Sequence, residues 1–297
     1  MIDLYQEIFH NPFMLKNTFI HMPGIGGVTE QRLWDSGITD WDAPLKVTPG
    51  SISAGRKNII TKGIEESRRH FEMGNPAFFS NNLPSNQSWR LFSEFRESTV
   101  YLDIETTGLE RDYNDITTIA LYDGTNIQTY VQGQNLNNFV DDIQKYNVII
   151  SYNGKSFDVP FIENYFGIQL NHAQIDLRYV LSSLGYKGGL KGCERQLGMD
   201  RGDLSDVDGF FAVILWNEYK KSANQKMLDT LLAYNVQDTV NLENLMVTAY
   251  NLKLQETPFY NSHRLYSPII PENPYEADLE TVDRIKYGSG FVRSNYW

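Results

Sequence analysis

Two carboxylates, Asp103 and Glu105, lie one residue apart in the apolar run YLDIETTGL. On an extended strand, residues two apart point to the same face, so these two side chains project together. Like charges held side by side repel each other, and a cation between them would relieve that repulsion. The spacing therefore indicates a possible metal site at the end of this strand.

Three further residues could complete such a site. Asp158 begins an expected helix directly after the apolar strand NVIISY, at the strand end where open α/β sheets bind ligands. Tyr234 and Asp238 are four residues apart on a long expected helix and so share one face of it. Such a set of hard oxygen ligands suits two Mg²⁺ or Mn²⁺ ions roughly 4 Å apart, which stabilise the attacking and leaving oxygens of a phosphodiester.

The hydrophobic pattern predicts the elements that must position these residues. DITTIALYD and TNIQTYVQG predict a hairpin that turns at Asp123-Gly124, and NVIISY (147–152) predicts a buried strand. NNFVDDIQKY, FDVPFIENYFG up to Gly167, and 225–252 predict helices. This order predicts an α/β fold: a mixed sheet, with an antiparallel meander followed by parallel strands, flanked by helices.

The chain is expected to have four sections. Residues 1–48 form a small helical segment, and residues 49–97 form a connector rich in Arg, Lys, Ser and Asn. Residues 98–252 form the α/β domain. Residues 253–297 form a C-terminal extension that is rich in Pro, Tyr and Asn, and we expect it to be loop or partly ordered.

Composition limits the class of protein. The chain has 297 residues, of which 41% are apolar, which is enough for a full core. It lacks an apolar run long enough for a membrane span and an N-terminal signal-peptide pattern, and its single cysteine, Cys193, suits a reducing compartment, so we expect a cytoplasmic protein. With a net charge of -11, it must bind any polyanion through local basic groups or divalent ions.

The segments DIETTGL, NGKSFD and YNVQD resemble, in order and type, the three exonuclease motifs of the DEDD superfamily, the DnaQ-like 3′–5′ exonucleases with a ribonuclease H-like fold. Tyr234, four residues before Asp238, is similar to the DEDDy branch, whereas the DEDDh branch would have His at the position of Ala233. WRLFSEF, DLRYVLSSLGYKGGLKGCERQLG and DGFFAVILW are similar to the YprB-like ribonuclease H-like family. The resemblance covers roughly residues 88–252 and implies metal-dependent phosphodiester hydrolysis from a 3′ end.

The resemblance also implies catalytic roles for single residues. Asp103 would bridge both metal ions. Glu105 and Asp238 would bind the ion that activates water, and Asp158 would hold the second ion, through water. Tyr234 would orient or help deprotonate the attacking water. The alternative is that the carboxylates only end a strand and cap or decorate helices.

Leu109 and the backbone of Thr106 and Thr107 fall where related enzymes contact the terminal nucleotide. These three residues are therefore candidates for substrate binding.

Further substrate contacts are expected near the second motif and in a glycine-rich segment. Asn153 and Lys155 lie in NGKSFD, and Lys191 in GGLKG could reach a substrate phosphate. Lys191 could instead pair with Glu194, and Asp176 is expected to cap a helix.

The segment MPGIGGVTEQRLWDSGI resembles half of a helix-hairpin-helix. Gly24 and Gly26 would let backbone N–H groups approach a DNA phosphate at the start of a helix. The segment itself carries little positive charge beyond Arg32, so the hairpin could equally serve only for packing or protein contact. Arg and Lys residues within 56–69 could supply the missing basic strip.

The sequence thus favours a 3′–5′ exonuclease that uses two divalent metal ions on single-stranded DNA or RNA 3′ ends. A structure-specific endonuclease on the same fold is one alternative. A catalytically weak nucleic-acid-binding module is another, although the complete set of five motif residues argues against it. The sequence predicts no membrane association and no particular protein partner.

Overall fold

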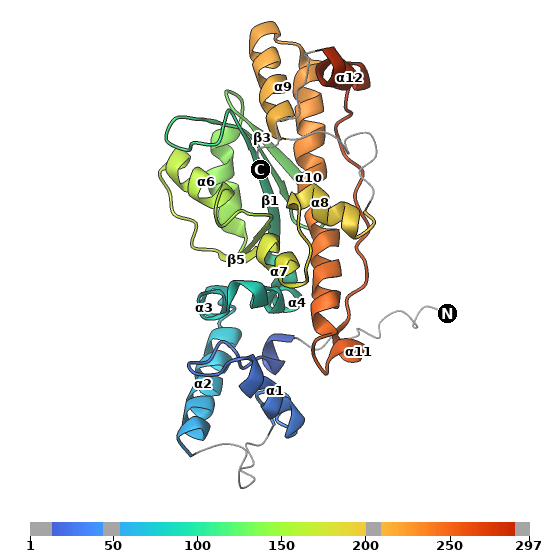
Figure 1. Ribbon diagram of the computed structural model, residues 1–297. Coiled ribbons are helices and arrows are strands. Elements are labelled where there is room, and N and C mark those ends of the chain that lie inside the picture. The colour runs from blue at the N-terminus through green and yellow to red at the C-terminus, as the bar shows by residue number, and fades with distance from the viewer. Residues whose placement is uncertain (1–13, 44–53, 200–208, 289–297) are drawn as a thin grey trace, which may run out of the picture.

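The computed structural model describes residues 14–43, 54–199 and 209–288, and its five-stranded sheet lies beside the long helix α10 (Gln225–Leu254) (Figure 1). The strand order is β3-β2-β1-β4-β5. β2 is antiparallel to both β1 and β3, and β4 is parallel to both β1 and β5, which confirms the predicted mixed sheet. The strands are β1 (Thr99–Thr106), β2 (Ile116–Tyr122), β3 (Ile127–Val131), β4 (Val148–Ser151) and β5 (Ala173–Asp176).

Helices cover both faces of the sheet. Leu102 and Ile104 of β1 belong to the same buried cluster as Phe161 of α6 (Asp158–Phe166), whereas Tyr101 belongs to the cluster that contains Val236 of α10 (Gln225–Leu254). Because side chains alternate along a strand, Asp103 and Glu105 share the face of Tyr101. The two acids of the first motif therefore point to the side of the sheet that α10 covers.

The predicted helices of the α/β domain are confirmed, with one difference. Gly167 ends α6 in the left-handed conformation, at φ 65°, and α10 spans the predicted long helix. The segment NNFVDDIQKY is not one α-helix: a four-residue α-helix lies between two 3₁₀ turns, and since only Phe139 and Ile143 of the segment are buried, little packing favours a longer α-helix. These pieces are η4 (Leu136–Asn138), α5 (Phe139–Asp142) and η5 (Ile143–Lys145). The remaining helices of this part are α7 (Leu177–Ser183), α8 (Gly189–Gln196) and α9 (Gly209–Ser222).

The segments on either side of the domain contain more helix than the sequence indicated. The region expected to be a connector includes the 19-residue helix α2, and the C-terminal extension contains α12, which follows a stretch that runs beside α10 (Figure 1). None of the helices in the described residues is long and apolar enough to cross a membrane. The elements before β1 are η1 (Met14–Asn17), α1 (Gly27–Asp35), α2 (Ala54–Glu72), α3 (Pro76–Asn82), η2 (Ser85–Leu91), α4 (Phe92–Phe95) and η3 (Arg96–Ser98). Those after α10 are α11 (Tyr260–His263) and α12 (Leu279–Gly288).

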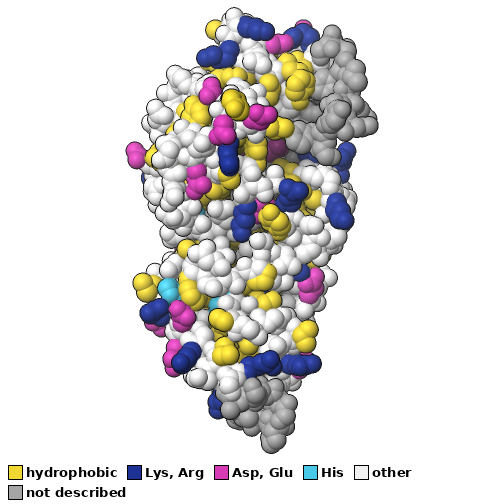
Figure 2. Space-filling model, turned by 60° about the vertical axis from the view of Figure 1, so that its left-hand side comes forward, with side chains coloured by type: hydrophobic (Ala, Val, Ile, Leu, Met, Phe, Trp, Pro, Cys, Tyr) yellow, Lys and Arg dark blue, Asp and Glu magenta, His cyan; other side chains and the backbone are white. Residues whose placement is uncertain are grey.

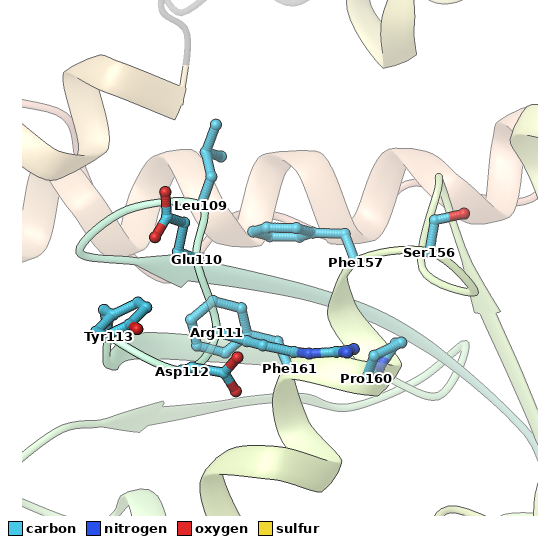
Figure 3. Close-up of a pocket in the computed structure, with 9 residues that line it drawn as sticks. All are labelled: Leu109, Glu110, Arg111, Asp112, Tyr113, Ser156, Phe157, Pro160 and Phe161. Atoms are coloured by element: carbon cyan, nitrogen blue, oxygen red, sulfur yellow. The ribbon is translucent and has the colours of Figure 1, made fainter.

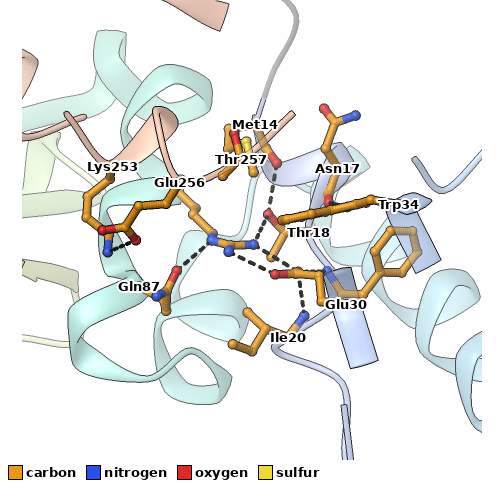
Figure 4. A network of polar contacts seen from close by, with 12 residues as sticks. Met14, Asn17, Thr18, Ile20, Glu30, Trp34, Gln87, Lys253, Glu256 and Thr257 are labelled. Atoms are coloured by element: carbon orange, nitrogen blue, oxygen red, sulfur yellow. Dashed lines mark hydrogen bonds and ion pairs between the residues drawn. The ribbon is translucent and has the colours of Figure 1, made fainter. Parts of the chain in front are cut away.

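A buried ion pair joins the N-terminal segment to the rest of the chain. Arg90 of η2 donates two hydrogen bonds of 2.9 Å to the carboxylate of Glu30 in α1, and both side chains are at most 5% exposed. Glu30 also accepts hydrogen bonds from the backbone N–H groups of Phe19 and Ile20 (Figure 4). Arg90 further donates to Gln87. Arg90 and Glu30 are each also bonded within their own part of the chain, so the ion pair holds the N-terminal segment in one position against the rest.

We predict that Arg90→Met lowers the free energy of unfolding by about 3–5 kcal/mol, because it leaves the Glu30 carboxylate buried without its cation. The control is Arg69→Met, which removes an exposed partner of Glu66 and should cost less than about 1 kcal/mol. Urea denaturation measures both values. Equal losses in the two variants would contradict a structural role for the buried pair.

Candidate functional site

The first motif ends in a distortion of the sheet. Glu105 lies opposite Thr118 of β2, but the next residue, Thr106, lies opposite Ile116, so the register shifts at this point. Such bulges bend a strand and redirect its side chains, and they are common beside active sites. The register shift lies directly after the two carboxylates, the skipped residue, Thr117, is on β2, and β1 ends at Thr106.

Asp158, from the second motif, is attached to the same strand. Its carboxylate accepts a hydrogen bond of 3.3 Å from the backbone N–H of Ile104, and its side chain is buried. Burial, with a smaller contribution from the negative charge of Asp176, raises the pKa of Asp158 to about 7. A carboxylate is thus held next to β1 in surroundings that oppose its ionisation unless positive charge is supplied.

Asp176 shapes the loop that leads to Asp158. As predicted, it caps a helix, by accepting from the backbone N–H of Arg178. It also accepts from the backbone N–H groups of Asn153 and Lys155, and the side chain of Asn153 accepts from Arg178. The structure therefore places Asn153 and Lys155, two candidate substrate contacts, in a loop held by Asp176, where burial lowers the pKa of Lys155.

Glycine is required at the centre of this loop. A Cβ atom on Gly154 would lie 2.0 Å from Oγ of Ser151 on β4 and 3.6 Å from a carboxylate oxygen of Asp158. No side chain fits at 2.0 Å, so the backbone at Gly154 can approach the strand only because it lacks one.

The third motif lies on α10, where Tyr234 and Asp238 are both buried. Between them, Asn235 donates a hydrogen bond of 2.7 Å to a carboxylate oxygen of Asp103. Nζ of Lys191, on α8, donates a hydrogen bond of 2.9 Å to the hydroxyl of Tyr234 and lies 4.4 Å from the centre of its ring. The structure thus brings α10 to Asp103 and places Lys191, a candidate phosphate contact, against the motif tyrosine.

Asn235 is a site residue that the sequence reasoning missed. No local signal marked it, because Gln237, Asp238 and Thr239 make this part of the helix polar as well. Only the fold shows that the amide is fully buried, and a buried polar side chain is normally hydrogen-bonded.

The donors around β1 are suited to a hard divalent cation. The four motif acids Asp103, Glu105, Asp158 and Asp238 offer carboxylate oxygens, which Mg²⁺ and Mn²⁺ prefer. Within residues 14–43, 54–199 and 209–288, however, no three His, Cys, Asp or Glu side chains form a ready-made metal site. The chemistry of the donor set therefore fits a divalent cation, while the arrangement of the side chains is not that of a finished cage.

A cleft of about 440 Å³ lies between the loop after β1 and the start of α6 (Figure 3). Its lining includes Leu109, Tyr113 and Phe157, and Leu109 and Tyr113 are 60% and 85% exposed. Asn164 of α6 donates to the backbone carbonyl of Arg111, which holds the loop against the helix. The candidate substrate residue Leu109 is therefore an exposed apolar side chain in the wall of a cleft.

The two threonines of the first motif are engaged within the chain. The hydroxyl of Thr106 donates to the carbonyl of Gly108, and the backbone N–H of Thr107 donates to the carbonyl of Asp115. The N–H of Thr107, where a nucleotide contact was expected, is thus used to close the loop.

At the N-terminal turn, Gly24 and Gly26 are exposed, and Gly26 precedes α1 without a side-chain cap. Gly24 has a φ of 75°, which glycine adopts without strain. Acidic and basic side chains are scattered over the face shown in Figure 2 rather than gathered in one basic area.

The family comparison agrees with the fold. The sequence model of the RNase H superfamily matches residues 100–250. Among solved structures, a family B DNA polymerase from the hyperthermophilic archaeon Pyrobaculum calidifontis is similar, with 14% sequence identity and a TM-score of 0.36. The match covers 52% of this chain and 29% of the polymerase chain. No curated protein matches the sequence.

We predict that Asp158→Asn stabilises the protein in EDTA more at pH 8 than at pH 4. An acid whose pKa is raised on folding binds more protons in the folded than in the unfolded state, so its burial costs stability progressively as the pH rises from about 4 to about 7. The amide removes that cost. The difference between the two pH values should be at least ~1 kcal/mol, since one pKa unit corresponds to about 1.4 kcal/mol.

Urea denaturation at the two pH values measures this effect. Asp141→Asn, at an exposed position, controls for the loss of one negative charge. A stabilisation by Asp158→Asn that is the same at both pH values would contradict the assigned burial of the carboxylate.

Proposed function

Because the chain belongs to the RNase H superfamily, we propose that it is a divalent-metal-dependent nuclease that removes nucleotides from the 3′ ends of single-stranded DNA or RNA. The observation that carries this proposal is the attachment of two other elements to the end of β1. The carboxylate of Asp158 is bonded to the backbone of this strand, and α10, which bears Tyr234 and Asp238, is bonded to Asp103 through Asn235.

In this proposal the motif acids hold two Mg²⁺ or Mn²⁺ ions, which when bound would activate water and neutralise negative charge on the phosphate. The four acids come from β1, from the start of α6 and from α10, and the loop held by Asp176 fixes where α6 begins. Because the four are not a ready-made cage, small side-chain movements would accompany binding. The ligands are Asp103, Glu105, Asp158 and Asp238.

Tyr234 would orient the attacking water. Lys191 donates a hydrogen bond to the oxygen of the Tyr234 hydroxyl, so the hydroxyl can donate its own hydrogen to a different acceptor. In this proposal, an oxygen of the attacking water or of the substrate phosphate would be a suitable acceptor. Lys191 would thus act through Tyr234 as well as by its charge near the substrate.

The cleft beside α6 would hold the unpaired end of the strand. Its walls carry the aromatic rings of Tyr113 and Phe157, and successive bases of single strands stack on such rings. Phe157 immediately precedes Asp158, and Leu109 lies four residues after Glu105. Residues that line the cleft are therefore close in sequence to two of the proposed catalytic acids.

The N-terminal turn would add a contact to the nucleic-acid backbone. Gly24 and Gly26 are exposed at the start of α1, where backbone N–H groups favour phosphate. The buried pair of Arg90 and Glu30 would keep this turn fixed relative to the nuclease domain.

The proposal is tested by digesting 5′-labelled single-stranded DNA and RNA with Mg²⁺, Mn²⁺ or EDTA, with wild-type protein and Asp103→Asn. We expect stepwise shortening from the 3′ end, abolished by EDTA and slowed at least ~100-fold by the substitution, which corresponds to about 2.7 kcal/mol of lost transition-state stabilisation. Activity that survives EDTA would exclude the metal-dependent mechanism.

A substrate blocked at its 3′ end separates the exonuclease from an endonuclease on the same fold. The exonuclease leaves the blocked strand intact, whereas internal cleavage of it would favour the endonuclease.

We predict that Tyr113→Ala raises KM for single-stranded substrate at least ~5-fold with little change in kcat. The ring is 85% exposed in the cleft, and stacking of one base on an aromatic ring contributes about 1–3 kcal/mol. Tyr266→Ala is the matched control, because Tyr266 is also 85% exposed but lies on the C-terminal extension, outside the residues that line the cleft. An equal change in KM in both variants would contradict a binding role for the cleft.

A further inference from the structure

Asn235 is a fully buried amide that joins three elements. Its Nδ2 donates to a carboxylate oxygen of Asp103 at 2.7 Å and to the backbone oxygen of the same residue at 3.2 Å. Its Oδ1 accepts a hydrogen bond of 3.0 Å from the hydroxyl of Thr118 on β2. The exposed fraction of the Asn235 side chain is 0%. One side chain of α10 is therefore bonded to both β1 and β2.

These partners determine which way the amide points. The carboxylate oxygen and the backbone oxygen of Asp103 are both acceptors, so the NH₂ group of Asn235 must face them. The hydroxyl of Thr118 can donate to the amide oxygen of Asn235 on the other side. Thr118 is paired with Glu105 in the sheet, so the anchor of the amide lies directly opposite the second acid of the first motif. The orientation of Asn235 is thus set by the sheet, and the amide transmits it to the carboxylate of Asp103.

The position of Asn235 in the third motif makes this contact relevant to the site. It follows Tyr234 directly and precedes Asp238 by three residues, so a bond at Asn235 also fixes the rotation of α10 that presents those two side chains. A hydrogen bond between a buried amide and a carboxylate orients ligands in metal sites, where loss of such a partner commonly weakens metal affinity 10–100-fold.

We propose that Asn235 is a positioning residue that holds the carboxylate of Asp103 in the orientation needed to bind the divalent metal ions. The inference rests on the proposed function, because it assigns Asp103 as a metal ligand. Asn235 itself touches neither substrate nor metal, and it acts through Asp103.

The experiment compares three variants of the full chain. Asn235→Ala removes both ends of the bridge. Asn235→Asp keeps the shape and can keep the bond from Thr118, but it replaces the donor facing Asp103 by a carboxylate oxygen. Asn241→Ala is the matched control, because Asn241 is also buried on α10 and donates to a carboxylate, that of Glu194, at 2.9 Å.

Mn²⁺ affinity is measured directly, by electron paramagnetic resonance titration, and thermal unfolding is measured in EDTA. We expect Asn235→Ala and Asn235→Asp to weaken Mn²⁺ binding at least ~10-fold. Asn241→Ala should lower the unfolding temperature but leave Mn²⁺ affinity within about 2-fold of wild type. Hydrolysis by the Asn235 variants should recover in part at high Mn²⁺ concentration, which a general loss of folding would not produce.

Two results would overturn the inference alone: wild-type Mn²⁺ affinity in both Asn235 variants, or an equal loss of affinity in Asn241→Ala. The isosteric Asn235→Asp keeps the test valid if Asn235→Ala does not fold. A wild-type chain that binds no Mn²⁺ and hydrolyses no nucleic acid would overturn the proposed function as well, so the two failures are distinguishable.

Discussion

The candidate site depends on how α10 is held against the sheet. Asn235 attaches the helix to Asp103 and Thr118. Two turns later, Glu243 forms an ion pair of 2.7 Å with Arg96, which lies in η3, the 3₁₀ turn directly before β1. Asn235 and Glu243 are both buried, so breaking either attachment would leave a buried polar group without a hydrogen-bond partner, which destabilises the fold. These two attachments fix the position of α10 along its axis and its rotation about that axis. They therefore also fix the positions of Tyr234 and Asp238, the two residues of the third motif.

The charge on the site gives this rigidity a cost. Asp158 is buried beside β1, and its raised pKa shows that the folded chain disfavours the ionised carboxylate there. The loop that carries it is nevertheless held by Asp176 and by the close approach of Gly154 to β4, so the carboxylate cannot easily move into water. Carboxylates that are held together at a cost in stability are expected where a bound cation is needed for function. The proposed metal ions would offset that cost.

Local signals in the sequence predicted most of the α/β domain, because a strand alternation, the terminating Gly167 or the capping Asp176 acts within a few residues. Helix α2 was not predicted, since its polar sequence buries only a few side chains such as Ile60 and Ile64, against a segment distant in the chain. In the site, the sequence placed the motif acids on the correct elements, but the bond from Asn235 to Asp103 spans 132 positions and no local pattern reveals it.

Anomalous X-ray scattering from crystals of the full chain soaked in MnCl₂ can show whether acids from β1, α6 and α10 bind divalent metal together. We predict two manganese peaks bounded by the four motif acids, with Asp103 in contact with both. Manganese bound only elsewhere, or no peak at concentrations that support hydrolysis, would contradict this prediction.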